Sequence, residues 1–212
     1  MTTLTTVLIT GGNRAIGKGF VQTFLSRPAT TVVVAVRNPE HATSKSLHEL
    51  PKGEGSLLIL AKLDSNITSD AGEHGIQALD IVIANAGIAS KSGNPIFVAI
   101  STLIGSIGSM EALAGFPPTQ SPYGGSKAAL NWFIRRLHFE EPWLASFVFH
   151  PGLVETDLAA GAVASGGSSL TLADLGAISV NTSVEGMVRV IDAATREVSG
   201  TFKVYDGTGV PW

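Results

Sequence analysis

A tyrosine and a lysine lie four residues apart, at Tyr123 and Lys127, in the stretch "SPYGGSKAALNWF". In a helix this spacing places both side chains on one face, one turn apart. An ammonium group beside a phenol favours the phenolate and lowers the phenol pKa, so the phenol can serve as a general acid or base. The same pair also occurs on solvated helix faces, where it has no catalytic role. The predicted elements around the Tyr-Lys pair are therefore needed to distinguish a catalytic pair from a surface pair.

A glycine-rich turn follows the first apolar run of the chain, in "VLITGGNRAIG" at residues 7–17. After the turn, Ile16, Phe20 and Phe24 form an apolar stripe at helical spacing. Backbone amides at the start of such a helix point outward at the positive end of the helix dipole, where a pyrophosphate can bind. The order of strand, glycine turn and helix favours a dinucleotide site over an ordinary tight turn.

Two arginines near this turn indicate which dinucleotide is bound. Arg37 follows the predicted second strand, at the place where an acidic residue would bind the ribose 2′-hydroxyl of NAD. Together with Arg14 in the glycine turn, it supplies two guanidinium groups that can bind a 2′-phosphate in bidentate fashion. The sequence therefore favours NADP(H) as the cofactor. The alternative is that both arginines are ordinary surface charges.

Short apolar runs alternate with helical patterns, which predicts an α/β fold with a three-layer, Rossmann-like, doubly wound parallel sheet. Strands are predicted near residues 6–10, 31–36, 56–63, 80–84, 96–101, 146–150 and 201–205. Helices are predicted at 14–26, 40–50, 124–140 and 184–195.

Three details of this pattern are specific enough to be checked. Ser183 is the predicted N-cap of the last helix. The helix at 124–140 has an apolar stripe made of Leu130, Phe133, Ile134 and Leu137. The small-residue stretch 159–169 is predicted to be a loop and a candidate lid.

The composition excludes several classes of function. The 212 residues predict a single domain, 1–212, and the net charge of −3 gives no basic surface for nucleic acid. No apolar run approaches the roughly 20 residues of a membrane span, and no signal peptide precedes the first strand, so a cytoplasmic location is expected. The chain contains no cysteine, and its five histidines have no metal-ligand spacing, so no metal site is predicted.

The motifs "TGGNRAIG", "NAG" at 85–87, "YGGSK" at 123–127 and "HPGLVETD" at 150–157 occur in this order along the chain. Each is weak alone, but as an ordered set they resemble the short-chain dehydrogenase/reductase family over essentially the whole chain. The stretches "GSIGSME", "LHFEEP" and "GTFKVYDGTGVPW" resemble fungal ketoreductases of the norsolorinic acid type.

The resemblance implies a carbonyl reductase in which Tyr123 protonates the substrate oxygen, while Lys127 binds the nicotinamide ribose and lowers the Tyr123 pKa. It also implies cofactor contacts along the chain. The phosphates would be lined by Thr10, Gly11, Asn13 and Ile16, with close packing at Gly17, the 2′-phosphate held by Arg37, and the adenine touched by Asp64. The central strand and the ribose would be stabilised by Asn85, Ala86 and Gly87, and the nicotinamide amide seated by Pro151, Gly152, Val154 and Thr156.

The chain departs from the family pattern at single residues. The middle glycine of the phosphate loop is replaced by Ala15, whose methyl group should weaken pyrophosphate binding without abolishing it. Alignment of Gly105 with the family's "SSxxG" motif places Thr102 at the catalytic serine, with Ser101 one residue earlier. A threonine hydroxyl can still donate to a carbonyl oxygen, although its methyl group restricts χ1.

Two connections are shorter than the family pattern, at 65–80 and 86–95. The second leaves no room for the long helix between the fourth and fifth strands, so that helix and its proton-relay asparagine are predicted to be missing. The uncovered strands would then need another cover, from association or a rearranged loop, unless the chain is a truncated form. A homodimer is possible by resemblance, but the missing helix puts it in doubt.

Three functions stay open at this stage. The first is NADPH-dependent reduction of a hydrophobic small-molecule ketone. The second is a catalytically impaired NADP-binding or interaction protein derived from such a reductase. The third is a non-redox isomerase or cyclase that uses Tyr123 as an acid.

Overall fold

The computed structural model describes residues 5–63, 79–84, 95–115, 120–165 and 171–212. They fall into two compact units, Met1–Val98 and Ala99–Trp212. The single domain 1–212 expected from chain length stays a prediction.

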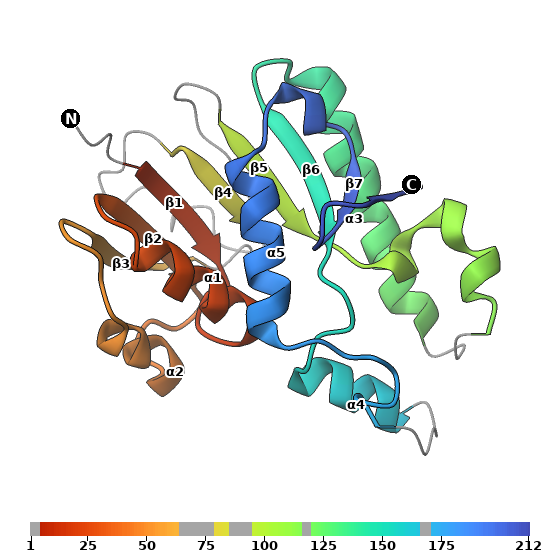
Figure 1. Cartoon of the computed structure of the whole chain (residues 1–212), viewed down its shortest axis with the longest axis horizontal. Coiled ribbons are helices and arrows are strands. Elements are labelled where there is room, and N and C mark those ends of the chain that lie inside the picture. The colour runs from red at the N-terminus through yellow and green to blue at the C-terminus, as the bar shows by residue number, and fades with distance from the viewer. Residues whose placement is uncertain (1–4, 64–78, 85–94, 116–119, 166–170) are drawn as a thin grey trace. The chain divides into compact units, whose positions relative to one another are not determined.

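The first unit is built on parallel strands. It contains β1 (Thr5–Thr10), α1 (Ala15–Leu25), β2 (Thr30–Val36), α2 (Ala42–Lys45), η1 (Ser46–Glu49), β3 (Leu57–Lys62), β4 (Ile81–Ala84) and the start of β5 (Ile96–Ile100). The strand order is β3-β2-β1-β4, with β1 between β2 and β4, as Figure 1 shows. All three pairings within this order are parallel.

The core of the first unit explains why its sequence reads as continuous apolar runs. Every residue of β2 is buried, as expected for a strand covered on both faces. Phe20, Val21 and Phe24 of α1 are fully buried, and α1 packs against β1 and β2. Burial of these side chains fixes the helix directly behind the glycine turn.

The second unit places two long helices around a smaller set of strands. It contains the end of β5, then η3 (Leu103–Gly105), η4 (Ile107–Ser109), η5 (Glu111–Leu113), α3 (Ser121–Glu140), β6 (Ala145–His150), α4 (Asp157–Ser165), α5 (Val180–Asp192), η7 (Arg196–Val198), β7 (Phe202–Val204) and β8 (Gly209–Val210). The order is β5-β6-β7-β8, with β6 and β7 parallel and β8 antiparallel to β7.

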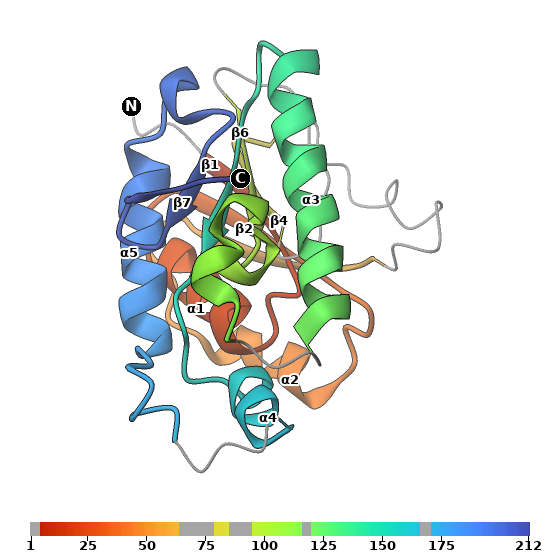
Figure 2. The same cartoon turned by 90° about the vertical axis from the view of Figure 1, so that its right-hand side faces the viewer.

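Helices α3 and α5 lie on opposite sides of β6 (Figure 2). The hydroxyl of Ser146 on β6 donates to the backbone oxygen of Ile134 on α3, so this side chain marks the strand face toward α3. Because side chains alternate along a strand, Val148 and His150 share that face. The last residue of β6 therefore points its side chain to the same side as the helix that carries Tyr123.

These parallel strands with helices on them confirm the predicted α/β class, and most predicted elements agree with the observed ones to within a few residues. The prediction of a loop over 159–169 is wrong for its first part, because 159–165 belong to α4. Alanine-rich sequence favours helix, and the Ala159 amide donates to the hydroxyl of Thr156 at the start of this helix.

Two further predictions about helices are wrong. The last helix begins at Val180 rather than 184, because Ser179, not Ser183, accepts the Thr182 amide as N-cap. Phe133 is 64% exposed and is not part of the buried stripe of α3. A rotation of about 100° per residue puts it on the side of the helix opposite buried Asn131.

The predicted loss of the helix between the fourth and fifth strands concerns residues outside the described part of the chain. Eleven residues, 85–95, connect Ala84 at the end of β4 to Ile96 at the start of β5. Among the described residues, no helix is both long and apolar enough to span a membrane.

Candidate functional site

The glycine turn of the first unit has the close packing that the sequence predicts. Gly11 has a φ of 62°, in the left-handed region that glycine tolerates best, and its amide donates to the Ala35 oxygen at 2.9 Å. A Cβ added to Gly17 would lie 2.4 Å from the Gly11 oxygen. Only glycine at position 17 allows α1 to start this close to the turn.

The start of α1 is suited to an anion. Its N-cap, Arg14, has extended backbone and provides no side-chain acceptor to the first-turn amides. Ala15, the first helical residue, has a φ of 45°. A non-glycine residue in this region carries strain, so the alanine in place of glycine has a measurable backbone consequence as well as an added methyl group.

Arg14 and Arg37 are both exposed. Arg37 directly follows the end of β2, as predicted. Asn13 donates through Nδ2 to the Thr43 hydroxyl at 2.8 Å, and the same hydroxyl lies 2.9 Å from Nδ1 of His41. Asn13 therefore connects the glycine turn to the start of α2. This contact holds the loop that follows Arg37 close to the turn.

In the second unit, Tyr123 and Lys127 lie on the first two turns of α3. The Lys127 ammonium donates to the Ile100 backbone oxygen at 2.8 Å and lies 5.8 Å from the centre of the Tyr123 ring. The tyrosine is 37% exposed. The lysine thus ties the helix to the carboxyl end of β5, and the phenol stays accessible beside it.

Burial raises the pKa of Tyr123 and lowers the pKa of Lys127. The lowering of the Tyr123 pKa expected from the sequence is not found. Loss of solvent around the phenol disfavours the phenolate, and this burial raises the pKa. In this structure Tyr123 is therefore a protonated phenol at neutral pH.

The two hydroxyl residues after β5 have different surroundings. Ser101 is 2% exposed, and its hydroxyl donates to Oδ1 of Asn131 at 2.5 Å. Thr102 is 8% exposed and caps η3, accepting the Ile104 amide at 3.4 Å. Of these two, only Thr102 keeps a hydroxyl hydrogen that no described contact uses. Its alignment with the catalytic serine position stays a prediction.

The segment after β6 is fixed by backbone contacts. The Pro151 oxygen accepts the Ser183 hydroxyl at 2.6 Å, and Val154 pairs with Ile178 as an isolated parallel bridge. Gly152 has a φ of 84°, and an added Cβ would lie 3.0 Å from the Ile178 side chain. The remaining predicted residue of this segment, Thr156, accepts the Ala159 amide.

Some predicted residues lie outside the described part of the chain: Asp64, Asn85, Ala86 and Gly87. Conversely, two polar side chains of the second unit had no role in the sequence analysis: Asn131, which is buried, and His150, which is half-buried. Asn131 follows Lys127 by four residues, so its place on the Tyr-Lys face of the helix was a readable signal. His150 has a buried Nδ1 without a partner among the described residues.

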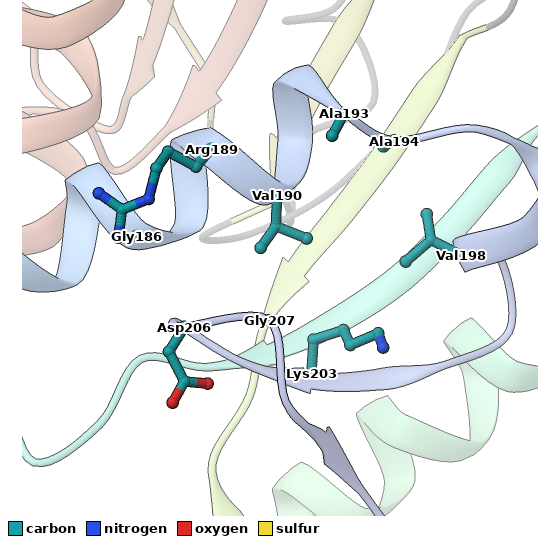
Figure 3. A pocket seen from close by; sticks show the side chains of 9 residues that line it. All are labelled: Gly186, Arg189, Val190, Ala193, Ala194, Val198, Lys203, Asp206 and Gly207. Carbon is teal, nitrogen blue, oxygen red and sulfur yellow. The ribbon is translucent and has the colours of Figure 1, made fainter.

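A hollow of about 310 Å³ lies in the second unit between the end of α5, η7 and β7 (Figure 3). Its lining contains none of the predicted site residues: Gly186, Arg189, Val190, Ala193, Ala194, Val198, Lys203, Asp206 and Gly207. Helix α5, which forms much of the lining, lies on the side of β6 away from α3 (Figure 2). The hollow is therefore separate from the Tyr123 region.

Comparison with known proteins is consistent with these features. The model of the family described as short chain dehydrogenase matches residues 5–101. A norsolorinic acid ketoreductase of Dothistroma septosporum is 35% identical, over 98% of this chain and 92% of that protein. A short chain dehydrogenase of Penicillium aethiopicum is 35% identical, over 98% of this chain and 99% of that protein.

The fold is that of a solved NADPH-bound carbonyl reductase from chicken fatty liver, with a TM-score of 0.76, 24% identity and full coverage of both chains. This likeness confirms the predicted Rossmann-like architecture. The alignment with the Dothistroma protein extends over 256 positions against 212 residues here, so at least 44 of them have no counterpart in this chain. The chain is thus shortened within the matched region.

Proposed function

Because the chain belongs to the short-chain dehydrogenase family, we propose that it is an NADPH-dependent reductase of a ketone group in a hydrophobic small molecule, with Tyr123 as the general acid. The observation that carries this proposal is the Lys127–Ile100 hydrogen bond. It fixes the Tyr-Lys helix at the end of β5, where Thr102 follows. The substrate class is taken from the names of the relatives, which are a ketoreductase and a carbonyl reductase.

NADPH, when bound, supplies a hydride to the carbonyl carbon. The residues of this chain act on the carbonyl oxygen of the substrate. Tyr123 gives its phenolic proton to that oxygen, so that ketone, hydride and proton yield an alcohol. Thr102 donates a hydrogen bond to the same oxygen and orients it. Lys127 holds the start of α3 at the end of β5 through its hydrogen bond to the Ile100 oxygen, and so keeps the phenol in place.

The residues of the first unit fit the phosphate groups of such a cofactor. The first-turn amides of α1 have no side-chain cap, and the space beside Gly17 is too small for any Cβ. Arg37, with Arg14, would hold the 2′-phosphate. Of the predicted contacts, those to the phosphates would come from Thr10, Gly11, Asn13 and Ile16, and those to the nicotinamide from Pro151, Gly152, Val154 and Thr156.

The direct test is to titrate the purified chain with NADPH and then follow NADPH oxidation and alcohol formation with aryl ketones such as acetophenone. We expect saturable binding and one alcohol formed for each NADPH oxidised. Conversion of a substrate without NADPH oxidation would overturn the proposal in favour of an isomerase or cyclase.

The cofactor preference can be tested at Arg37. We expect Arg37→Gln to raise the Kd for NADPH about tenfold, because a hydrogen bond between charged groups is lost, and to change the Kd for NADH less than twofold. Fluorescence titration of both cofactors measures this. Arg136→Gln removes an arginine that is also exposed, on α3, and controls for net charge. An equal loss for NADH and NADPH would contradict the proposed contact.

The strained alanine gives a second prediction. Ala15→Gly removes the methyl group and the left-handed strain, and we expect it to lower the Kd for NADPH about three- to tenfold. Its effect on stability should stay below about 1 kcal/mol, because the relieved strain is offset by the greater entropy of glycine in the unfolded chain. Titration and thermal unfolding measure the two effects.

Ala29 provides the matched control, since it also has a positive φ, 49°, in a turn before β2. We expect Ala29→Gly to change stability by a similar amount and leave the Kd for NADPH unchanged. If both variants bind NADPH with the affinity of the wild type, Ala15 does not limit cofactor binding.

The second candidate function is an impaired, NADP-binding relative of such reductases. The strain at Ala15 and the use of Thr102 as a cap favour it. NADPH binding with no turnover in the wild type and in Ala15→Gly would select this function.

A further inference from the structure

A buried polar bridge joins the loop after β5 to the middle of α3. Asn131 is 4% exposed on α3 and uses both ends of its amide. Its Oδ1 accepts the Ser101 hydroxyl at 2.5 Å, and its Nδ2 donates to the Gly105 oxygen at 3.0 Å. The two partners lie on either side of Thr102 in the sequence. One side chain therefore holds the Thr102 segment at two points.

The packing around this bridge leaves little freedom. A Cβ added to Gly105 would lie 2.7 Å from Cβ of Lys127, and one added to Gly124 would lie 3.0 Å from the Ile104 oxygen. Helix α3 and η3 thus approach each other closely at two glycines: Gly105 of η3 lies against Lys127 of α3, and Gly124 of α3 lies against Ile104 of η3. The polar bridge sets the orientation of two surfaces that are already in contact.

The spacing along α3 places Asn131 on the same helix face as the Tyr-Lys pair. Tyr123, Lys127 and Asn131 follow one another at four-residue intervals on one face of the helix. Lys127 binds the end of β5, at Ile100, and Asn131 binds the next residue and the end of η3. A buried amide that satisfies two groups with good geometry fixes their relative position better than apolar packing does.

Building on the proposed reductase function, we propose that Asn131 is a positioning residue for catalysis. It holds the hydroxyl of Thr102 at a fixed place relative to the phenol of Tyr123, by binding Ser101 before it and Gly105 after it. The role of Ser101 is then to complete this bridge rather than to contact the substrate.

The experiment combines Asn131→Leu, Ser101→Ala and the double variant with a matched control. Asn131→Leu keeps a similar volume and removes both hydrogen bonds. We expect kcat for acetophenone reduction to fall about thirtyfold, because a small misplacement of a catalytic group costs one to two orders of magnitude. The Kd for NADPH should change less than threefold.

The double variant separates positioning from stability. Removing Ser101 together with Asn131 takes away two partners at once, which costs less stability than leaving one of them buried and unpaired. We expect its melting temperature to recover relative to Asn131→Leu, while kcat stays about thirtyfold low. A residue that acts only through stability would show recovery of both.

Ser146→Ala is the control for loss of a buried hydrogen bond to α3, since the Ser146 hydroxyl contacts Ile134 far from Thr102 in the sequence. We expect it to lower the melting temperature and change kcat less than twofold. Equal losses of kcat in Ser146→Ala and Asn131→Leu would overturn the inference, as would a wild-type kcat in Asn131→Leu.

Hydrogen exchange tests the same inference without a substrate. The amides of Gly105 and Ser106 donate to the Thr102 and Leu103 oxygens within this segment. We expect them to exchange at least tenfold faster in Asn131→Leu and at the wild-type rate in Ser146→Ala. A wild type without reductase activity overturns the proposed function, whereas unchanged exchange at these amides overturns the positioning role of Asn131.

Discussion

Tyr123→Phe should lower kcat for ketone reduction by a factor between about one hundred and ten thousand. The substitution removes only the phenolic oxygen, so the ring keeps its place beside Lys127 and the helix keeps its start at Ser121. The proton that the carbonyl oxygen needs must then come from water, at a less favourable position. The Kd for NADPH should change less than threefold, because the phenol acts on the oxygen of the substrate.

The pH dependence of the wild type gives an independent check on this role. A general acid must be protonated, and burial raises the pKa of Tyr123. The rate of reduction should therefore be flat through neutral pH and fall only in the alkaline range, as the phenol loses its proton. In Tyr123→Phe this alkaline fall should be absent from the residual activity. Steady-state kcat measured across pH for both proteins tests the assignment.

Tyr205 is the matched control, since it is the only other tyrosine of the chain. Its ring packs near Gly152 and Gly186, on the segment after β6 and on α5. We expect Tyr205→Phe to change kcat less than twofold. If Tyr123→Phe retains more than a tenth of the wild-type kcat, Tyr123 is not the general acid.

The strands were predictable because each is a short apolar run whose neighbours are polar or glycine. β2 shows this best: all of its residues are buried, and its sequence, "TTVVVAV", is rich in the β-branched residues that favour strands. The glycine turn was predictable for a similar reason. Gly17 is required by the close approach to the Gly11 oxygen, a constraint that acts on a single residue and so leaves a clear mark in the sequence.

The predictions failed where two local signals compete. Ser179 and Ser183 are both good N-caps, and the choice between them depends on the tertiary contact that Ser183 makes with the Pro151 oxygen. Phe133 fits an apolar stripe by type, yet the helix buries Asn131 instead. Burial of an asparagine is stable only when both ends of its amide make hydrogen bonds. Here the partners are Ser101 and Gly105, which are distant from Asn131 in the sequence.

The pKa of Tyr123 also could not be read from the sequence. The spacing to Lys127 predicts proximity, and the two side chains are indeed close. The direction of the pKa shift depends on how much solvent the phenol loses on folding, which spacing along a helix does not reveal. Here burial of the phenol raises the pKa of Tyr123.

His150 should make the stability of the second unit depend on pH. Burial lowers its pKa from 6.5 to about 4, and Nδ1 is buried without a partner among the described residues. Between these two pKa values, His150 is therefore protonated in the unfolded chain and neutral in the folded chain. The free energy of unfolding therefore has its full value above pH 6.5 and decreases as the pH falls from 6.5 toward 4. A shift of this size corresponds to about 3 kcal/mol.

The measurement is the free energy of unfolding by urea at about pH 7.5, 6, 5 and 4, which spans the window between the two pKa values. It is made on the wild type and on His150→Asn, whose side chain does not titrate. His138 lies near Arg135 and Arg196, and burial, followed by these charges, lowers its pKa as well, so the wild-type curve contains both histidines. The difference between wild type and variant isolates His150, because His138 is common to both. His48→Gln, at an exposed histidine, controls for the loss of one imidazole. A difference that stays constant from neutral to acidic pH would mean that His150 is solvated in the folded chain, and that the end of β6 beside the catalytic helix is open to water.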